Sequence, residues 1–273
     1  MNIQLVVPTK GCINNCPFCC SKMHDSPYET HFDSIEIEKR IKYAVMRGID
    51  TCVLTGTGKV LQNTPFLEQL HRIFEKLDHP FPNVELQTTG VMLLNENNRF
   101  ESINILKRLR VNTISLSISD LFSDKNNSRI IGIPAKLQFE LLELIGFLKK
   151  QNFNVRLSLN MLNNLDDKTP EEIFQYAKSL RADQISFKKM YYNEDSQYEQ
   201  NKWICDNKCK EETLDNIKEY VKTYGRHMYT LEFGSKVYSV NGLSTVVVDD
   251  CMAVNNTEVP RYIILRENGK LLS

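Results

Sequence analysis

The sequence predicts an α/β fold, a partial (β/α)6 TIM-like barrel followed by a C-terminal α+β extension. Strand patterns alternate with helical patterns from residue 2 to residue 190, which is typical of parallel βαβ units with right-handed crossovers. Six strands of this kind are present, too few for a closed barrel of eight. After Met190 the chain becomes polar and then changes to short strand patterns. We therefore expect a core of residues 1–190 and an extension of residues 191–273, packed on the core.

Six segments have the composition of strands, because they are apolar or alternate between apolar and polar residues. They are residues 2–7, 51–55, 84–88, 113–119, 155–161 and 184–190. Between them, apolar residues recur at helical spacing. Asp33 or Ser34 can cap the first helix, and Pro65 occupies a tolerated first-turn position in the second. The expected helices are residues 33–47, 64–77, 99–109, 136–150 and 170–180.

The polar faces of the last three core strands predict a chamber inside the barrel. Alternation places serines on one face of residues 115–119 and apolar residues on the other. An ordinary barrel interior is filled with branched apolar residues, so a polar interior indicates space for solvent or ligand. The alternative is an open sheet with its polar faces in water. The polar faces of the other two strands contain Arg156, Ser158, Asn160, Gln184, Ser186 and Lys188.

The extension combines one helical pattern with several short strands. The expected elements are a helix over 211–224, short strands within 226–248 and a final strand over 261–266. Asn241-Gly242 is a strong hairpin signal. Cys205, Cys209 and Cys251 could hold an auxiliary cluster, but thiols without a metal are favoured, because this region has no C-x2-C pair.

The composition excludes several classes of protein. Lys+Arg and Asp+Glu both number 34, which argues against a broad nucleic-acid or membrane-binding surface. Eight cysteines, irregularly spaced in 273 residues, do not form a disulfide scaffold. No apolar stretch is long enough to span a bilayer, and the N-terminus lacks the pattern of a signal peptide. The expected location is therefore the cytoplasm.

Three cysteines follow the first strand with C-x3-C-x2-C spacing: Cys12, Cys16 and Cys19. Four-iron clusters normally take four thiolates, so a cluster held by three keeps one iron open to another molecule. An open position is what a metal site needs for chemistry. The alternative is a closed zinc site with Cys20 or His24 as fourth ligand. Because no second cysteine pair lies nearby, the open iron–sulfur cluster is the favoured interpretation.

With Phe18 before its last cysteine, this stretch resembles the signature of the radical S-adenosylmethionine (SAM) superfamily. The resemblance implies the same partial barrel and a [4Fe–4S] cluster on Cys12, Cys16 and Cys19. It implies that SAM binds the open iron and is cleaved reductively to methionine and a 5′-deoxyadenosyl radical, which abstracts hydrogen from a substrate. An external electron donor such as flavodoxin or ferredoxin is also implied. Chemistry is expected at the carboxyl ends of the strands, where the cysteine loop lies.

The resemblance extends to several SAM-binding positions. The turn after the second strand is similar to the family's glycine-rich turn, although Lys59 stands where an acidic residue is usual. Glycine would let the backbone approach the SAM ammonium group. Phe18 would shield the cluster. The residues that the resemblance assigns to cofactor binding are Phe18, Gly56, Thr57, Gly58, Thr88, Ser117 and Asn160.

The substrate is only partly indicated. Arg156 and Lys188 in the chamber would suit an anionic group, with Glu85 and Gln87 as further polar contacts. A small phosphorylated or nucleotide-like metabolite is the first hypothesis, and a ribosomally made peptide is the second. A hypothesis of another class is a non-catalytic iron–sulfur or zinc regulatory protein, which would have no need of a polar interior.

Overall fold

The computed structural model describes residues 2–23, 32–95, 99–193, 195–248 and 262–272. It divides into two compact units. The first contains Met1–Ile13, Ser26–Ser115 and Glu258–Ser273, and the second contains Asn14–Asp25 and Leu116–Thr257. His24 and Cys251 lie outside the described residues. The division into a core of residues 1–190 and an extension of residues 191–273 stays a prediction.

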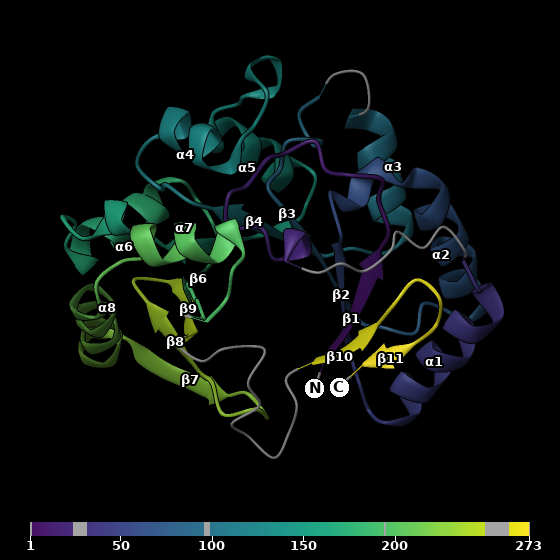
Figure 1. Cartoon of the computed structure of the whole chain (residues 1–273). Helices are drawn as coiled ribbons and strands as arrows, with labels where there is room; N and C mark the ends of the chain where they lie inside the picture. The colour runs from purple at the N-terminus through teal and green to yellow at the C-terminus, as the bar shows by residue number, and fades with distance from the viewer. Residues whose placement is uncertain (1, 24–31, 96–98, 194, 249–261, 273) are drawn as a thin grey trace. The chain divides into compact units, whose positions relative to one another are not determined.

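The first unit is a mostly parallel sheet with helices beside it (Figure 1). Its strands follow the order β11-β10-β1-β2-β3, and only the β10–β11 pair is antiparallel. The chain's last strands thus extend the sheet beside its first strand. The strands are β1 (Asn2–Val7), β2 (Thr51–Gly56), β3 (Asn83–Thr88), β10 (Tyr262–Leu265) and β11 (Leu271–Leu272).

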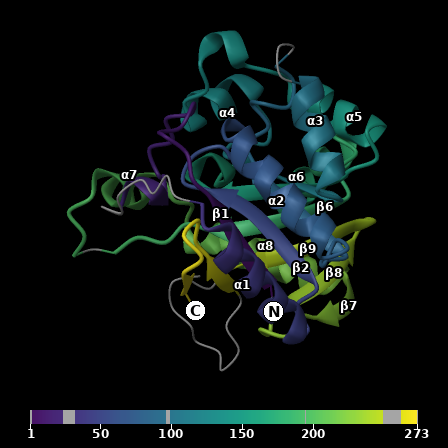
Figure 2. The same cartoon turned by 90° about the vertical axis from the view of Figure 1, so that its right-hand side faces the viewer.

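Two helices of the first unit begin after side chains that cap them. Figure 2 looks onto these helices. The Asp33 side chain accepts a hydrogen bond from the Glu36 N–H (2.9 Å), and Asn63 accepts one from the Phe66 N–H (3.1 Å). Each bond satisfies a donor that a helix start leaves free. The helices are α1 (Ser34–Met46), α2 (Thr64–Lys76) and α3 (Arg99–Arg108).

The second unit has the strand order β5-β6-β9-β8-β7. β6 pairs in parallel with both β5 and β9, whereas β8 is antiparallel to β9 and β7. Its strands are β5 (Asn154–Met161), β6 (Gln184–Lys189), β7 (Arg226–Thr230), β8 (Lys236–Val240) and β9 (Leu243–Val248). Its helices are α4 (Asp124–Ile131), α5 (Leu141–Lys150), α6 (Pro170–Ser179), α7 (Glu199–Asn207) and α8 (Glu211–Tyr224). The remaining strand, β4 (Thr113–Ile118), spans the division between the units.

The six core strands are confirmed within a residue or two, but the predicted helix over 136–150 is wrong in its first part. Ala135–Leu137 forms a 3-10 turn, Gln138 is extended, and α5 starts only at Leu141. The Asp124 carboxylate accepts a hydrogen bond from the Leu141 N–H (3.1 Å) and so fixes this later start. Helix α4 was not predicted.

The polar face of β5 and β6 is partly buried, with Arg156, Gln184 and Lys188 half-buried. Ser158, Asn160 and Ser186 are at most 8% exposed. Their hydroxyl and amide groups need partners inside the protein, because a buried polar group without one is costly. The alternative of a sheet with these polar residues in open water is therefore wrong for this pair of strands.

Candidate cofactor site

The cysteine loop follows β1, and its four cysteines are not joined by disulfides. Cys12 is exposed, and Cys16 and Cys19 are half-buried. Among the described residues, no three His, Cys, Asp or Glu side chains are gathered into a ready metal site. The loop is turned back on itself by the Lys22 ammonium group, which donates to Asn15 Oδ1 (2.5 Å) and to the Cys16 carbonyl (3.3 Å). The Cys16 thiol in turn donates to the Ile131 carbonyl at the end of α4 (3.3 Å).

The glycine turn after β2 packs against the start of this loop. Thr57 Oγ1 accepts a hydrogen bond from the Thr9 N–H (3.0 Å). Gly58 is so close that a side chain there would overlap the Thr9 hydroxyl and the Gly11 carbonyl, and its Cβ would lie 3.3 Å from Cys12 Cα. Glycine at position 58 therefore permits the close approach of turn and loop.

An aromatic contact covers the second half of the loop. The rings of Phe18 and Trp203 have their centroids 5.4 Å apart, with Trp203 supplied by α7. Lys188 on β6 lies close enough to act on the same segment. Cys20 is partly exposed, but burial of its sulfur raises the pKa of the thiol, and the neighbouring Cys19 raises it further. The charge of Lys188 lowers this pKa by a smaller amount. The charge of a lysine on β6 is thus felt at Cys20.

The structure joins polar residues from the ends of β4 and β5. Asn160 Nδ2 donates to Ser119 Oγ (3.2 Å), and Asn164 Nδ2 donates to the Ser119 carbonyl (3.1 Å). Deeper in the sheet, the hydroxyls of Ser158 and Ser186 lie 3.5 Å apart. Ser117, assigned to SAM from the sequence, is half-buried on β4. Asn160 therefore belongs to a hydrogen-bonded group with Ser119 and Asn164. The sequence pointed to Asn160 but not to these partners.

The four residues suggested for the substrate lie on three strands. Glu85 and Gln87 belong to β3 in the first unit, with Glu85 buried and Gln87 half-buried. Arg156 and Lys188 are half-buried on β5 and β6 in the second unit. Arg156 Nε donates to Gln184 Oε1 (2.7 Å), so this guanidinium group already has a partner on the neighbouring strand.

Two buried polar residues were missed in the sequence. The side-chain amide of Asn14, within the cysteine loop, and the hydroxyl of Thr89, after β3, have no hydrogen-bond partner among the described residues. By contrast, Thr88 Oγ1 accepts a hydrogen bond from the Gly90 N–H (3.2 Å). Thr88, which was assigned to SAM binding from the sequence, thus stabilises its own turn. The sequence contained Thr89 in the same tripeptide but gave no signal that its hydroxyl is the unsatisfied one.

The remaining cysteines do not form a second site among the residues that the structure describes. Cys205 is exposed on α7 and Cys209 is buried after it. Burial, with the negative charges of Asp166 and Glu211, raises the pKa of the Cys209 thiol to about 11. Such a thiol is a poor metal ligand at neutral pH, because the thiolate is the ligating form.

The comparisons with known proteins give the family. The model of the radical SAM superfamily matches residues 6–180, more than half of the chain. The chain belongs to the radical SAM superfamily. Enzymes of this superfamily bind a [4Fe–4S] cluster and SAM, so the family and the class of cofactor predicted from the cysteine motif are confirmed. A search of curated proteins found no match.

Solved structures share the fold at low sequence identity. Streptococcus suis SuiB, crystallised with its precursor peptide SuiA, has 14% identity and a TM-score of 0.58 over 99% of this chain and 59% of its own. The anSMEcpe structure with bound AdoMet has 14% identity and a TM-score of 0.54 over 82% of this chain and 60% of its own. Escherichia coli coproporphyrinogen III oxidase (HemN), a radical SAM enzyme, has 14% identity and a TM-score of 0.51 over 97% of this chain and 62% of its own.

These matches confirm the predicted α/β, TIM-like partial barrel fold. This radical SAM chain spans about three fifths of the length of each of these structures. Within its described residues, the search for bilayer-spanning segments found no helix of sufficient length and apolar character.

Proposed function

We propose that this chain is a radical SAM enzyme whose cluster is held by Cys12, Cys16 and Cys19. The observation that carries the proposal is the set of three cysteines with C-x3-C-x2-C spacing on the loop after β1, inside the region matched to the superfamily. Three thiolates suit a four-iron cluster with one open iron. When bound, the cluster supplies the electron that cleaves SAM to methionine and a 5′-deoxyadenosyl radical, which abstracts hydrogen from the substrate.

The residues around the loop fit a cluster in this position. Asn14 provides a buried amide with no partner among the described residues, and hydrogen bonds to cluster sulfurs are one way in which a protein sets the reduction potential. Phe18 and Trp203 place an aromatic contact beside the same segment. Cys16 now donates its thiol proton to the Ile131 carbonyl, and it gives up that hydrogen bond when it ligates as a thiolate.

For SAM, we propose contacts from the glycine turn and from the ends of the following strands. Gly56, Thr57 and Gly58 present backbone groups beside the cysteine loop. Asn160, held by Ser119, offers its remaining amide oxygen to a ligand. Ser117 and Thr88 are the other assigned polar contacts, and Thr89 is added because its buried hydroxyl has no partner in the described part of the chain. Their part is to bind and orient SAM.

For the substrate, a small anionic or nucleotide-like metabolite remains the first proposal. Lys188 supports it, because it is a half-buried cation on the face of β6 that is predicted to line the chamber. A peptide is the second candidate, since SuiB was crystallised with a precursor peptide and shares its fold with 99% of this chain. An external flavodoxin or ferredoxin would supply the electron in the cell, and the cytoplasm stays the proposed location.

The test is production of 5′-deoxyadenosine. Protein reconstituted with iron and sulfide without oxygen would be mixed with dithionite and SAM, and the product measured by chromatography. Cys16→Ala should abolish the product, whereas Cys205→Ala, which removes an exposed cysteine outside the motif, should retain it. An iron-loaded wild type that forms no deoxyadenosine, with or without candidate substrates, would favour the regulatory alternative, and a protein that takes up zinc instead of iron would overturn the proposal.

A further inference from the structure

We propose that Gly132 is a positioning residue for the cluster, because its missing side chain lets the cysteine loop dock on the C-terminal end of α4. The inference rests on the proposed function and concerns a residue outside the cysteine motif. It assigns a role to α4, a helix that the sequence did not predict.

The contact between α4 and the loop is made through two backbone carbonyls at the end of the helix. Gly132 ends the helix in the left-handed region (φ 68°, ψ 45°). Its carbonyl accepts a hydrogen bond from the Asn15 N–H (3.2 Å), and the preceding Ile131 carbonyl accepts one from the Cys16 thiol (3.3 Å). Two successive residues of the loop thus bond to two successive carbonyls at the helix end.

A side chain at position 132 would occupy the place of the loop. A Cβ built on Gly132 lies 2.9 Å from the backbone N, C and O atoms of Asn15, closer than real Cβ atoms approach other atoms. All three are backbone atoms, so no side-chain rotation can relieve the overlap. Either α4 or the segment Asn15–Cys16 must move.

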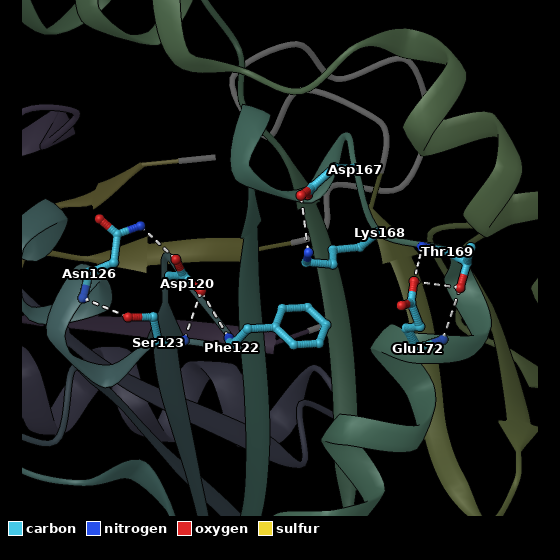
Figure 3. Close-up of polar contacts among 8 residues, drawn as sticks. All are labelled: Asp120, Phe122, Ser123, Asn126, Asp167, Lys168, Thr169 and Glu172. Carbon is cyan, nitrogen blue, oxygen red and sulfur yellow. Dashed lines mark hydrogen bonds and ion pairs between the residues drawn. The ribbon is translucent and has the colours of Figure 1, made fainter.

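Helix α4 is held firmly at its other end. Asn127 Oδ1 accepts hydrogen bonds from the Ser119 N–H (2.8 Å) and the Asp120 N–H (3.2 Å). Figure 3 shows Asp120 in turn accepting from the Phe122 N–H (2.8 Å), the Ser123 N–H (3.1 Å) and Asn126 Nδ2 (2.6 Å). These bonds tie α4 to the segment after β4. The loop, which has exposed residues on both sides of Asn14, is the part that gives way.

Displacement of Asn15 moves the neighbouring Cys16, a proposed ligand. Residues that orient metal ligands typically change metal affinity roughly 10- to 100-fold when they are mutated. We therefore expect Gly132→Ala to hold its iron that much less tightly than the wild type. The Phe18–Trp203 contact offers a second readout, because Trp203 is the chain's single tryptophan and Phe18 belongs to the displaced loop.

The experiment compares two glycines that share a left-handed backbone. Gly242 also has a positive φ (86°), but nothing lies within 4 Å of a Cβ built there. Gly132→Ala and Gly242→Ala thus impose the same kind of backbone strain, and only the first obstructs the loop. Gly132→Asn and Gly242→Asn form a second pair, because asparagine tolerates the left-handed region better than alanine but still carries a Cβ.

Three measurements are made on each protein: tryptophan emission before iron is added, iron per chain after reconstitution and chelator challenge, and the electron paramagnetic resonance spectrum of the reduced cluster. Both Gly132 variants should show altered emission, faster iron loss and a changed spectrum, while both Gly242 variants should match the wild type. Circular dichroism and thermal melting report whether each variant is folded.

Failure of this inference is distinguishable from failure of the proposed function. Folded Gly132 variants with wild-type emission, iron retention and spectrum would overturn the positioning role and leave the cluster intact. Unfolding of both Gly132 variants, with folded Gly242 variants, would also overturn it, since Gly132 would then serve folding alone. A wild type that binds no iron would overturn the proposed function itself.

Discussion

Asp120 shows how much a single buried carboxylate can organise. It is 7% exposed, and its two oxygens accept the three hydrogen bonds drawn in Figure 3. Asp120→Ala should lower the free energy of unfolding by about 2–3 kcal/mol, because three donors on half-buried residues lose their partner. Urea unfolding followed by circular dichroism measures the loss.

The same figure supplies the matched control. Asp167 forms an ion pair with Lys168 (3.0 Å), but its side chain is 74% exposed. An exposed ion pair contributes little, so Asp167→Ala should change the stability by less than about 0.5 kcal/mol. Equal effects of the two substitutions would show that the hydrogen bonds of Asp120 do not stabilise the fold as described.

At the residue scale, the sequence predicted chemistry better than it predicted hydrogen bonding. The spacing of Cys12, Cys16 and Cys19 was sufficient to indicate a cluster, because ligand spacing is local. Whether Thr88 or Thr89 has a free hydroxyl depends on burial and on the turn at Gly90, which no local pattern shows. Asn14 was missed for the same reason.

At the scale of single elements, helical patterns in the sequence predicted several helices closely. Helix α8 was predicted with its observed bounds, and α1 lies within its predicted span. The failure over 136–150 has a tertiary cause, since Asp124 on α4 accepts the hydrogen bond that starts α5. Helix α4 has only 8 residues, and its apolar residues Ile130 and Ile131 are adjacent, so no apolar residue recurs at helical spacing to mark it in the sequence.

The start of α6 offers a test of capping. Thr169 Oγ1 accepts a hydrogen bond from the Glu172 N–H (3.2 Å), and Glu172 Oε2 accepts one from the Thr169 N–H (2.8 Å), a capping box seen in Figure 3. Thr169→Ala should reduce the free energy of unfolding by about 1 kcal/mol.

Thr223→Ala is the control for this cap. Thr223 lies exposed in the last turn of α8, where alanine is the better helix former, so the stability should stay equal or rise slightly. Both variants would be compared with the wild type by urea unfolding. A loss at Thr223 as large as that at Thr169 would contradict the role of the cap.

For the whole molecule, strand–helix alternation was sufficient to predict the α/β class and the parallel core strands. It could not predict that β10 pairs with β1, or that β9 pairs with β6. Each of these pairs joins strands far apart in the sequence, and their formation depends on which sheet edge is free once the core has formed. For the extension, the sequence therefore predicted the helix and the strands but not which strands pair with the core.

The stability of the molecule should depend on pH through His71, a buried residue of α2. Burial first, and then the charge of Arg108, lower the pKa of His71, and these effects outweigh the opposing charges of Glu75 and Glu68. Arg108 Nη2 lies 3.1 Å from His71 Nδ1, and His79 packs nearby. The neutral imidazole is thus the form that the fold accommodates.

The sign of the effect follows from proton binding. In the unfolded chain His71 titrates near pH 6.5, above its pKa in the folded protein. Between these two values the unfolded state holds more protons, so stability decreases as the pH falls below about 6.5 and the loss is complete at the folded pKa. His71→Gln should flatten this decrease, whereas His227→Gln, at an exposed position on β7, should not. The test is the urea midpoint of unfolding, measured from about pH 8 to about pH 5. If the midpoint fell equally steeply with pH in the wild type and in His71→Gln, the prediction would be contradicted.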